Sequence, residues 1–104
     1  MPSLADAIIQ QDVMTIKQLL QFNAPVNELD QYGFTPLIEA AIVNNQSIAE
    51  LLIANGAIVN LQDVTGGTAL HWAAENNNIA FCTMLLKQGA DPNACNLEIG
   101  RAHV

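Results

Sequence analysis

Apolar residues recur at intervals of three and four within short runs along the chain, and polar or glycine-containing breaks separate the runs. This spacing places the apolar side chains of each run on one face of a helix. The pattern predicts helices near residues 4–11, 15–22, 36–43, 47–54, 69–76 and 80–87. The predicted fold class is therefore all-α.

The breaks carry residues that begin and end helices. Thr68 stands where an N-cap hydroxyl accepts from the first unpaired N–H groups of a helix, and Pro36 stands in a first helical turn, where its missing N–H costs nothing. Gly89 follows an apolar run, at a position where a left-handed residue ends the helix. Asn23 and Asn44 stand at similar breaks, and asparagine tolerates the left-handed conformation.

The chain repeats itself after 33 residues. This shift places Asp30 on Asp63, Gly33 on Gly66, Thr35 on Thr68, Leu37 on Leu70, Ala40-Ala41 on Ala73-Ala74, Asn44-Asn45 on Asn77-Asn78, Leu52 on Leu85, Gly56-Ala57 on Gly89-Ala90 and Asn60 on Asn93. A weaker and more polar copy precedes them, as expected of a terminal capping repeat. One helical pair of this size cannot bury its apolar faces alone, so the copies are expected to stack. We expect one domain over residues 1–104, with repeats at about 1–29, 30–62 and 63–95 and a partial fourth turn at 96–104.

The repeat motifs resemble those of ankyrin repeats. The resemblance rests on Thr35-Pro36-Leu37 and Thr68-Ala69-Leu70-His71, each followed by Ala-Ala and later by Gly-Ala and Asn. It implies a solenoid of helix pairs joined by β-hairpin-like turns, with a concave face that binds another protein or peptide. It also implies that His71 hydrogen-bonds between neighbouring turns and that the Asn60 side chain ties a loop to backbone groups. The alternative is a targeting or regulatory segment of a larger enzyme or effector, whose catalytic domain lies outside this chain.

Composition and charge limit the classes of partner that the chain can bind. The formal net charge is −7, from 10 acidic and 3 basic residues, which argues against nucleic acid and against an anionic membrane surface. The scattered acidic residues either serve solubility or form a docking face. No apolar run approaches the roughly 18 residues of a membrane span, and no secretory signal is visible. Cys82 and Cys95 are not expected to pair, so a cytoplasmic or otherwise intracellular protein is predicted.

Catalytic, metal and cofactor sites are not predicted. The residues His71, Cys82, Cys95 and His103 lack the closely paired spacing of a zinc site. Cys82 is expected to be buried on a helix face and Cys95 to lie in a loop, and neither has a predicted base beside it. The pair Gly66-Gly67 is explained by the repeat turn and is not a phosphate loop.

A protein-binding site is predicted at positions that the repeat framework leaves variable. These are the hairpin tips and the solvent side of the first helix of each repeat, and they hold Tyr32, Phe34, Glu39, Ile42, Val43, Trp72, Glu75 and Asn76. Aromatic anchors dominate interface energetics, and Glu39 and Glu75 are expected to form a polar rim. Such a groove suits an apolar or amphipathic segment with a basic flank. The alternative is that the apolar members pack on each other or on flanking repeats.

The third repeat has no complete repeat after it in this sequence. It is expected to present Leu70, Ala74, Leu85 and Leu86 on a face that a following helix pair normally covers. Either the chain is cut from a longer protein, or the face promotes self-association.

Overall fold

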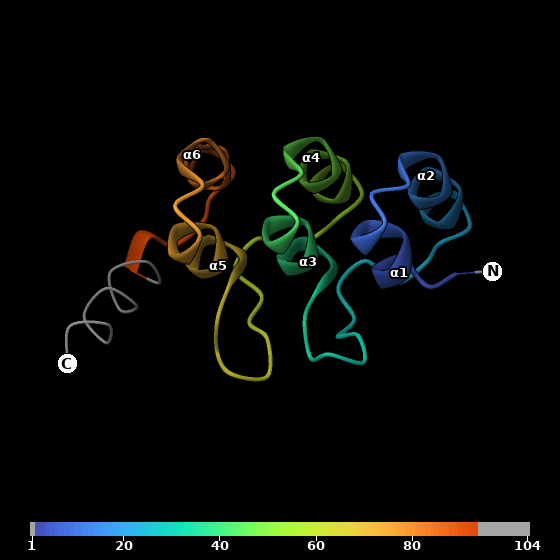
Figure 1. Cartoon of the computed structure of the whole chain (residues 1–104), viewed down its shortest axis with the longest axis horizontal. Coiled ribbons are helices and arrows are strands. Elements are labelled where there is room, and N and C mark those ends of the chain that lie inside the picture. Colours follow the sequence, from blue (N-terminus) through green and yellow to red (C-terminus); the bar gives the residue numbers. More distant parts are fainter. Residues whose placement is uncertain (1, 94–104) are drawn as a thin grey trace.

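The computed structural model describes residues 2–93, and six helices lie between residues 4 and 87 (Figure 1). They are α1 (Leu4–Ile9), α2 (Val13–Gln21), α3 (Pro36–Ile42), α4 (Gln46–Ala54), α5 (Ala69–Glu75) and α6 (Ile79–Lys87). No strand occurs among the described residues. The all-α prediction is confirmed, and each helix begins and ends within two residues of its predicted bounds.

The helices form two layers, with α1, α3 and α5 in one and α2, α4 and α6 in the other (Figure 1). We call the first the inner layer, because two hairpins extend from its side, at residues 30–34 before α3 and at residues 63–67 before α5. In the inner layer, α3 packs against both α1 and α5. Ala40, Ala41 and Ala73 are fully buried there, and their small side chains permit close approach of the helices. The larger core side chains lie between the layers, among them Ile16, Ile38, Ile48, Leu52, Phe81 and Leu85.

Side chains begin and end these helices as predicted. Thr35 Oγ1 accepts from the Ile38 N–H at 3.2 Å, and Thr68 Oγ1 accepts from the His71 N–H at 3.4 Å. After α3, Asn44 has a left-handed backbone conformation, with a φ of 56°. The asparagine here supplies the conformation that glycine supplies elsewhere.

Two asparagines join consecutive repeats. Asn27 donates from Nδ2 to the Gly56 carbonyl at 3.1 Å and accepts from the Ile58 N–H at 2.8 Å. Asn60, 33 residues on, donates to the Gly89 carbonyl at 3.1 Å and accepts from the Asp91 N–H at 2.8 Å. The predicted tie from Asn60 to backbone groups is confirmed.

The prediction for the end of the stack is partly wrong. Leu70 and Leu85 are 2% and 0% exposed, because both belong to the core between α5 and α6. Ala74 is half-buried, whereas Ile79 and Leu86, both on α6, are 77% and 46% exposed. Self-association through this end stays a prediction that light scattering tests. The predicted fourth turn at 96–104, which includes His103, lies outside the described residues, and so does Cys95.

Candidate protein-binding surface

Each hairpin is built on one aspartate. Asp30 Oδ1 accepts from the N–H groups of Tyr32 and Phe34, at 2.8 and 3.1 Å. Asp63 Oδ1 accepts from the corresponding N–H groups of Thr65 and Gly67, at 2.8 and 2.9 Å. The carboxylates therefore fix the backbone of both loops, and the side chains at the tips are held in place.

The two hairpins also touch each other. The Val64 N–H donates to the Gly33 carbonyl at 3.2 Å, and Gly33 has a φ of 83°. A Cβ atom on Gly33 would lie 2.7 Å from Val64 Cγ2, closer than carbon atoms pack. Glycine is thus required here both for the turn and for the approach of the second hairpin.

Apolar side chains gather on these hairpins and on the adjacent helix. Tyr32 and Val64 are 56% and 69% exposed. Behind them Phe34 meets Trp72 edge to face, with ring centroids 5.4 Å apart and planes at 79°. We call these four residues, Tyr32, Phe34, Val64 and Trp72, the hairpin surface.

Trp72 packs against Phe34 of the first hairpin and is also hydrogen-bonded to the second hairpin. Its Nε1 donates to Asp63 Oδ2 at 2.9 Å. Burial alone would raise the pKa of Asp63, but the hydrogen bonds from Thr65, Trp72 and Gly67 outweigh it and hold the pKa below its ordinary value. Phe34 and Trp72 therefore do pack on each other, while both stay half-buried.

Glu39 does not form a rim, so that part of the prediction is wrong. It is 3% exposed, and the cause is its position on the covered side of α3, next to Asp30. Burial in the first place, and then the Asp30 carboxyl, raise the pKa of Glu39 to about 8.

The remaining predicted residues lie at the other end of the inner helices. Ile42 and Val43 end α3, and Glu75 and Asn76 end α5 at the corresponding positions one repeat later. Ile42 and Val43 are half-buried against the core, while Glu75 and Asn76 are exposed. Phe34 precedes α3 and Val43 ends it, so Ile42 and Val43 are separated from the hairpins by the length of the helix, on the order of 10 Å at 1.5 Å per residue. Glu75 and Asn76 lie about one helical turn after Trp72, which belongs to the same helix.

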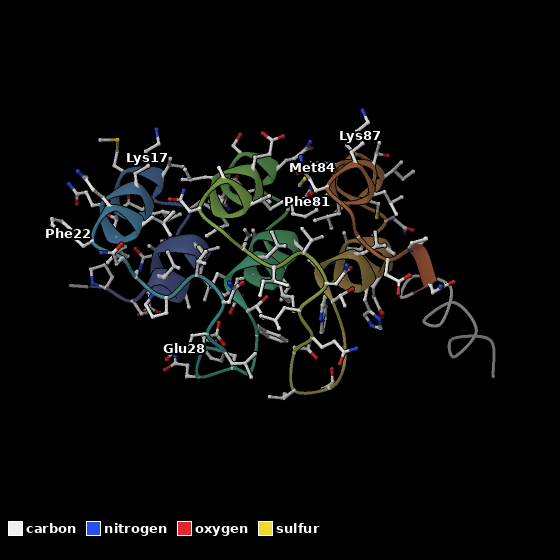
Figure 2. All side chains as sticks on the ribbon, turned by 180° about the vertical axis from the view of Figure 1, so that it is seen from behind. Lys17, Phe22, Glu28, Phe81, Met84 and Lys87 are labelled. Carbon is white, nitrogen blue, oxygen red and sulfur yellow. The ribbon has the colours of Figure 1, made fainter. Side chains whose placement is uncertain are left out.

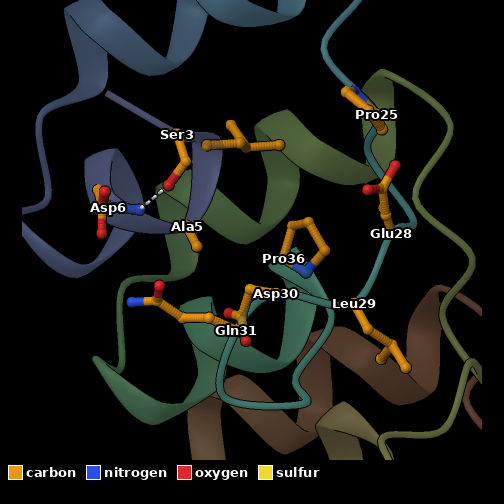
Figure 3. Close-up of a pocket in the computed structure, with 10 residues that line it drawn as sticks. Ser3, Ala5, Asp6, Pro25, Glu28, Leu29, Asp30, Gln31 and Pro36 are labelled. Atoms are coloured by element: carbon orange, nitrogen blue, oxygen red, sulfur yellow. Dashed lines mark hydrogen bonds between the residues drawn. The ribbon is translucent and has the colours of Figure 1, made fainter. Parts of the chain in front are cut away.

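An acidic cavity of about 230 Å³ lies beside the first hairpin, between it and the start of α1 (Figure 3). It is lined by Ser3, Leu4, Ala5, Asp6, Pro25, Glu28, Leu29, Asp30, Gln31 and Pro36. Ligand pockets usually measure roughly 300–1,000 Å³. This cavity is therefore sized for a single side chain, with carboxyl groups from Asp6, Glu28 and Asp30 around an apolar wall.

The two lysines of the described chain both lie in the outer layer. In the described chain the inner helices and hairpins carry five acidic residues, Asp6, Asp30, Glu39, Asp63 and Glu75, with Glu28 just before the first hairpin, and no lysine or arginine. Lys17 and Lys87 both lie on outer helices, α2 and α6, away from the hairpin side where Glu28 lies (Figure 2). Of these acidic residues Asp6, Glu28 and Glu75 are exposed, so the face that bears the hairpin surface presents acidic groups and, among its described residues, no lysine or arginine.

The site predicted from the sequence did not include Val64, and the two hairpin aspartates had no predicted role in it. Val64 looks ordinary in the sequence, and its exposure depends on where the second hairpin lies. Asp30 and Asp63 coincide under the 33-residue shift, and that signal was sufficient to mark them as structural.

The described part of the chain shows no metal site and no membrane-spanning helix. No group of three or more His, Cys, Asp and Glu residues is placed to hold a metal ion there. His71 Nε2 lies 3.9 Å from Glu75 Oε2, and its predicted bonding between turns stays a prediction. Within residues 2–93, no helix has the length and apolar character to cross a membrane.

Helix pairs stacked at a fixed period, with hairpins along one side, define a helical repeat solenoid. A family model described as ankyrin repeats, in three copies, matches residues 4–96. The chain belongs to the ankyrin-repeat family, whose members are generally non-catalytic modules for protein–protein interaction.

The chain matches only a small part of the length of each relative below. A solved structure of the Legionella effector AnkH has a TM-score of 0.81 and 44% identity, over 89% of this chain and 20% of that chain. BTB/POZ domain-containing protein 3 of Schizosaccharomyces pombe is 30% identical over 56 residues, which are 53% of this chain and 11% of that protein. The poly [ADP-ribose] polymerase tankyrase of Caenorhabditis elegans is 30% identical over 57 residues, 55% of this chain and 2% of that protein.

Proposed function

We propose that this chain is a non-catalytic module that binds another protein through the hairpin surface. The observation that carries the proposal is the pair of exposed apolar side chains, Tyr32 and Val64, on hairpins that Asp30 and Asp63 hold in place. Exposed apolar groups on a preorganised backbone lose little conformational entropy on binding. They are therefore suited to anchor a partner.

The partner is an apolar or amphipathic segment with basic residues beside it. The inner face carries only acidic formal charges among its described residues, which attracts lysine and arginine and repels acidic segments. The cavity beside the first hairpin adds a specific place for one such side chain. Its aliphatic stem would contact Leu29 and Pro36, and its charged end would meet Asp6 and Glu28.

The inner-helix ends extend the proposed surface. Ile42, Val43, Glu75 and Asn76 end the same inner helices that the hairpins precede, so a segment that runs along these helices from the hairpin surface would reach them. We keep Phe34, Trp72 and Glu39 in the site as supports for the hairpins. Their packing and burial suit that role better than direct contact.

Selection from a library of random peptides tests the proposal without a known partner. We expect enriched peptides with aromatic or aliphatic residues beside lysine or arginine, and we expect Tyr32→Ala with Val64→Ala to abolish their binding. Phe22→Ala is the matched control, because Phe22 is 74% exposed at the C-terminal cap of the outer helix α2, away from the hairpins. Absence of enrichment, or equal loss in the control, would contradict the proposal.

A second role is favoured by one observation. The chain resembles 20% of the length of a Legionella effector at 44% identity, so these repeats also fit a targeting or regulatory segment of a larger effector or enzyme. An antibody raised against this chain, used on extracts of the source cells, distinguishes the two. A band at the 11.2 kDa of this chain favours the separate module, and a much larger band favours the segment. Immunofluorescence with the same antibody tests the intracellular location that we propose from the cysteine pattern.

A further inference from the structure

The second and third repeats place different side chains next to the aspartate of the hairpin. Asp30 corresponds to Asp63 and Glu39 corresponds to Trp72, each 33 residues apart. In the third repeat, the Trp72 indole N–H donates to Asp63 Oδ2, the carboxylate oxygen that does not bind the hairpin amides. In the second repeat, the residue at the indole position is a second carboxylic acid.

Two oxygens of this carboxyl pair are left without a partner. Asp30 Oδ2 and Glu39 Oε2 are buried, and neither has a hydrogen bond. Buried oxygens of this kind are rare because each costs its full desolvation energy. Two neighbouring buried carboxylates cannot both ionise cheaply, whereas one proton turns the pair into a donor and an acceptor.

The surroundings of this carboxyl pair hold acidic groups and one histidine. The elements around α3 and the first hairpin carry these titratable groups: Asp6 on α1, Glu28 before the first hairpin, Glu50 on α4, His71 and Glu75 on α5, and Asp63 in the second hairpin. Asp6, Glu50 and Glu75 are exposed, and Asp63 is occupied by Trp72. No lysine or arginine occurs on α1, α3, α4 or α5.

We propose that Glu39 and Asp30 share one proton that holds the first hairpin in its binding conformation, and that loss of this proton at alkaline pH releases the hairpin. The link to the hairpin is direct, because the same Asp30 carboxylate accepts from the Tyr32 and Phe34 amides through Oδ1. When Glu39 ionises, repulsion between the two carboxylates moves them apart. This movement strains the hydrogen bonds that the Tyr32 and Phe34 N–H groups donate to Asp30. The regulatory meaning rests on the proposed function, since Tyr32 is one of its anchors.

The raised pKa of Glu39, about 8, puts this transition near physiological pH. The third repeat does not share it, because Trp72 donates an N–H that does not titrate. The protein therefore contains its own control, in a second hairpin of the same construction.

Amide NMR of the isolated chain, with no partner present, tests the proposal from about pH 5 to about pH 9. We expect the Tyr32 and Phe34 amide resonances to move with a single midpoint that matches the Glu39 side-chain carboxyl ¹³C resonance. The Thr65 and Gly67 amides, bonded to Asp63, should stay in place over the same range. Since no binding is measured, failure here is separate from failure of the proposed function.

Glu39→Gln supplies the decisive variant, because glutamine keeps a donor toward Asp30 at every pH. The expected result is that the Tyr32 and Phe34 amides no longer titrate and keep the positions seen at low pH in the natural chain. Unmoved amides in the natural chain, or the same movement in Glu39→Gln, would overturn the proposal. If the variant does not fold, a Glu39 carboxyl midpoint at the ordinary glutamate value overturns it equally.

Discussion

Trp72 donates its indole N–H to Asp63 Oδ2 across 2.9 Å, and this bond ties the inner helix of the third repeat to its own hairpin. Trp72→Phe keeps a ring against Phe34 and removes only the donor. We expect it to lower the free energy of unfolding by about 1–3 kcal/mol, since the carboxylate loses a partner in a half-buried place. Urea denaturation measures the change.

The same substitution also changes the titration of Asp63. Its pKa lies below the ordinary value in the folded chain, so its contribution to stability is present above the unfolded pKa and is lost as pH falls through the folded pKa. Without the indole donor the pKa should rise and the acid limb of the stability profile should move to higher pH. An unchanged urea midpoint and acid limb would mean that the bond contributes nothing.

The six helices could be predicted from the sequence because the residues that begin and end them act locally. The caps Thr35 and Thr68, and left-handed Asn44, act on their own neighbours, so spacing alone located every helix between residues 4 and 87. The site was less predictable because burial is set between elements. Glu39 occupies a position that is variable in the repeat pattern, yet its carboxyl lies 3% exposed beside a loop nine residues earlier in the chain.

Gly33 should tolerate substitution less well than Gly66. Both have positive φ, 83° and 88°, so alanine costs roughly 1–2 kcal/mol of backbone strain at either position. Only at Gly33 would the new Cβ meet Val64, at 2.7 Å, while nothing lies within 4 Å at Gly66. We expect Gly33→Ala to be the more destabilising of the two in urea denaturation, and we expect the additional cost to disappear when Gly33→Ala is combined with Val64→Ala. Equal costs would show that the hairpins do not touch in solution.

Asn60 should couple the second and third repeats. Asn60→Ala removes both bonds that cross to the next repeat, to Gly89 and Asp91, and is expected to cost about 1–3 kcal/mol. In a stacked array, weaker coupling also lets the third repeat open separately, which hydrogen exchange detects as selective loss of protection in α5 and α6. Asn55→Ala is the control, because Asn55 donates to Leu51 within its own repeat. Uniform loss of protection would argue against a coupling role.

Stability should fall as pH rises from about 4.5 to about 8. The folded pKa of Glu39, about 8, exceeds the reference value of 4.5, so over this window the folded chain holds a proton that the unfolded chain has lost. The stabilising contribution is complete below the unfolded pKa and is gone above the folded pKa. Glu39→Gln should flatten this limb of the profile, whereas Glu50→Gln, on the exposed side of α4, should leave it in place. An identical slope in both variants would assign the effect to other groups.

The hairpin surface should divide into anchors and supports, and this separates binding from folding. Tyr32→Ala removes a side chain that is 56% exposed, so we expect a change in unfolding free energy within about 0.5 kcal/mol and a loss of about 1–4 kcal/mol in binding of a selected peptide. Trp72→Ala removes the contact to Phe34 and the bond to Asp63 together, and should lower both stability and binding. Calorimetry of the peptide complex and urea denaturation of each variant give the two numbers independently. If Tyr32→Ala lowers stability as much as Trp72→Ala does, Tyr32 belongs to the packing of the hairpins. If instead it leaves peptide affinity unchanged, the partner is bound elsewhere on the chain.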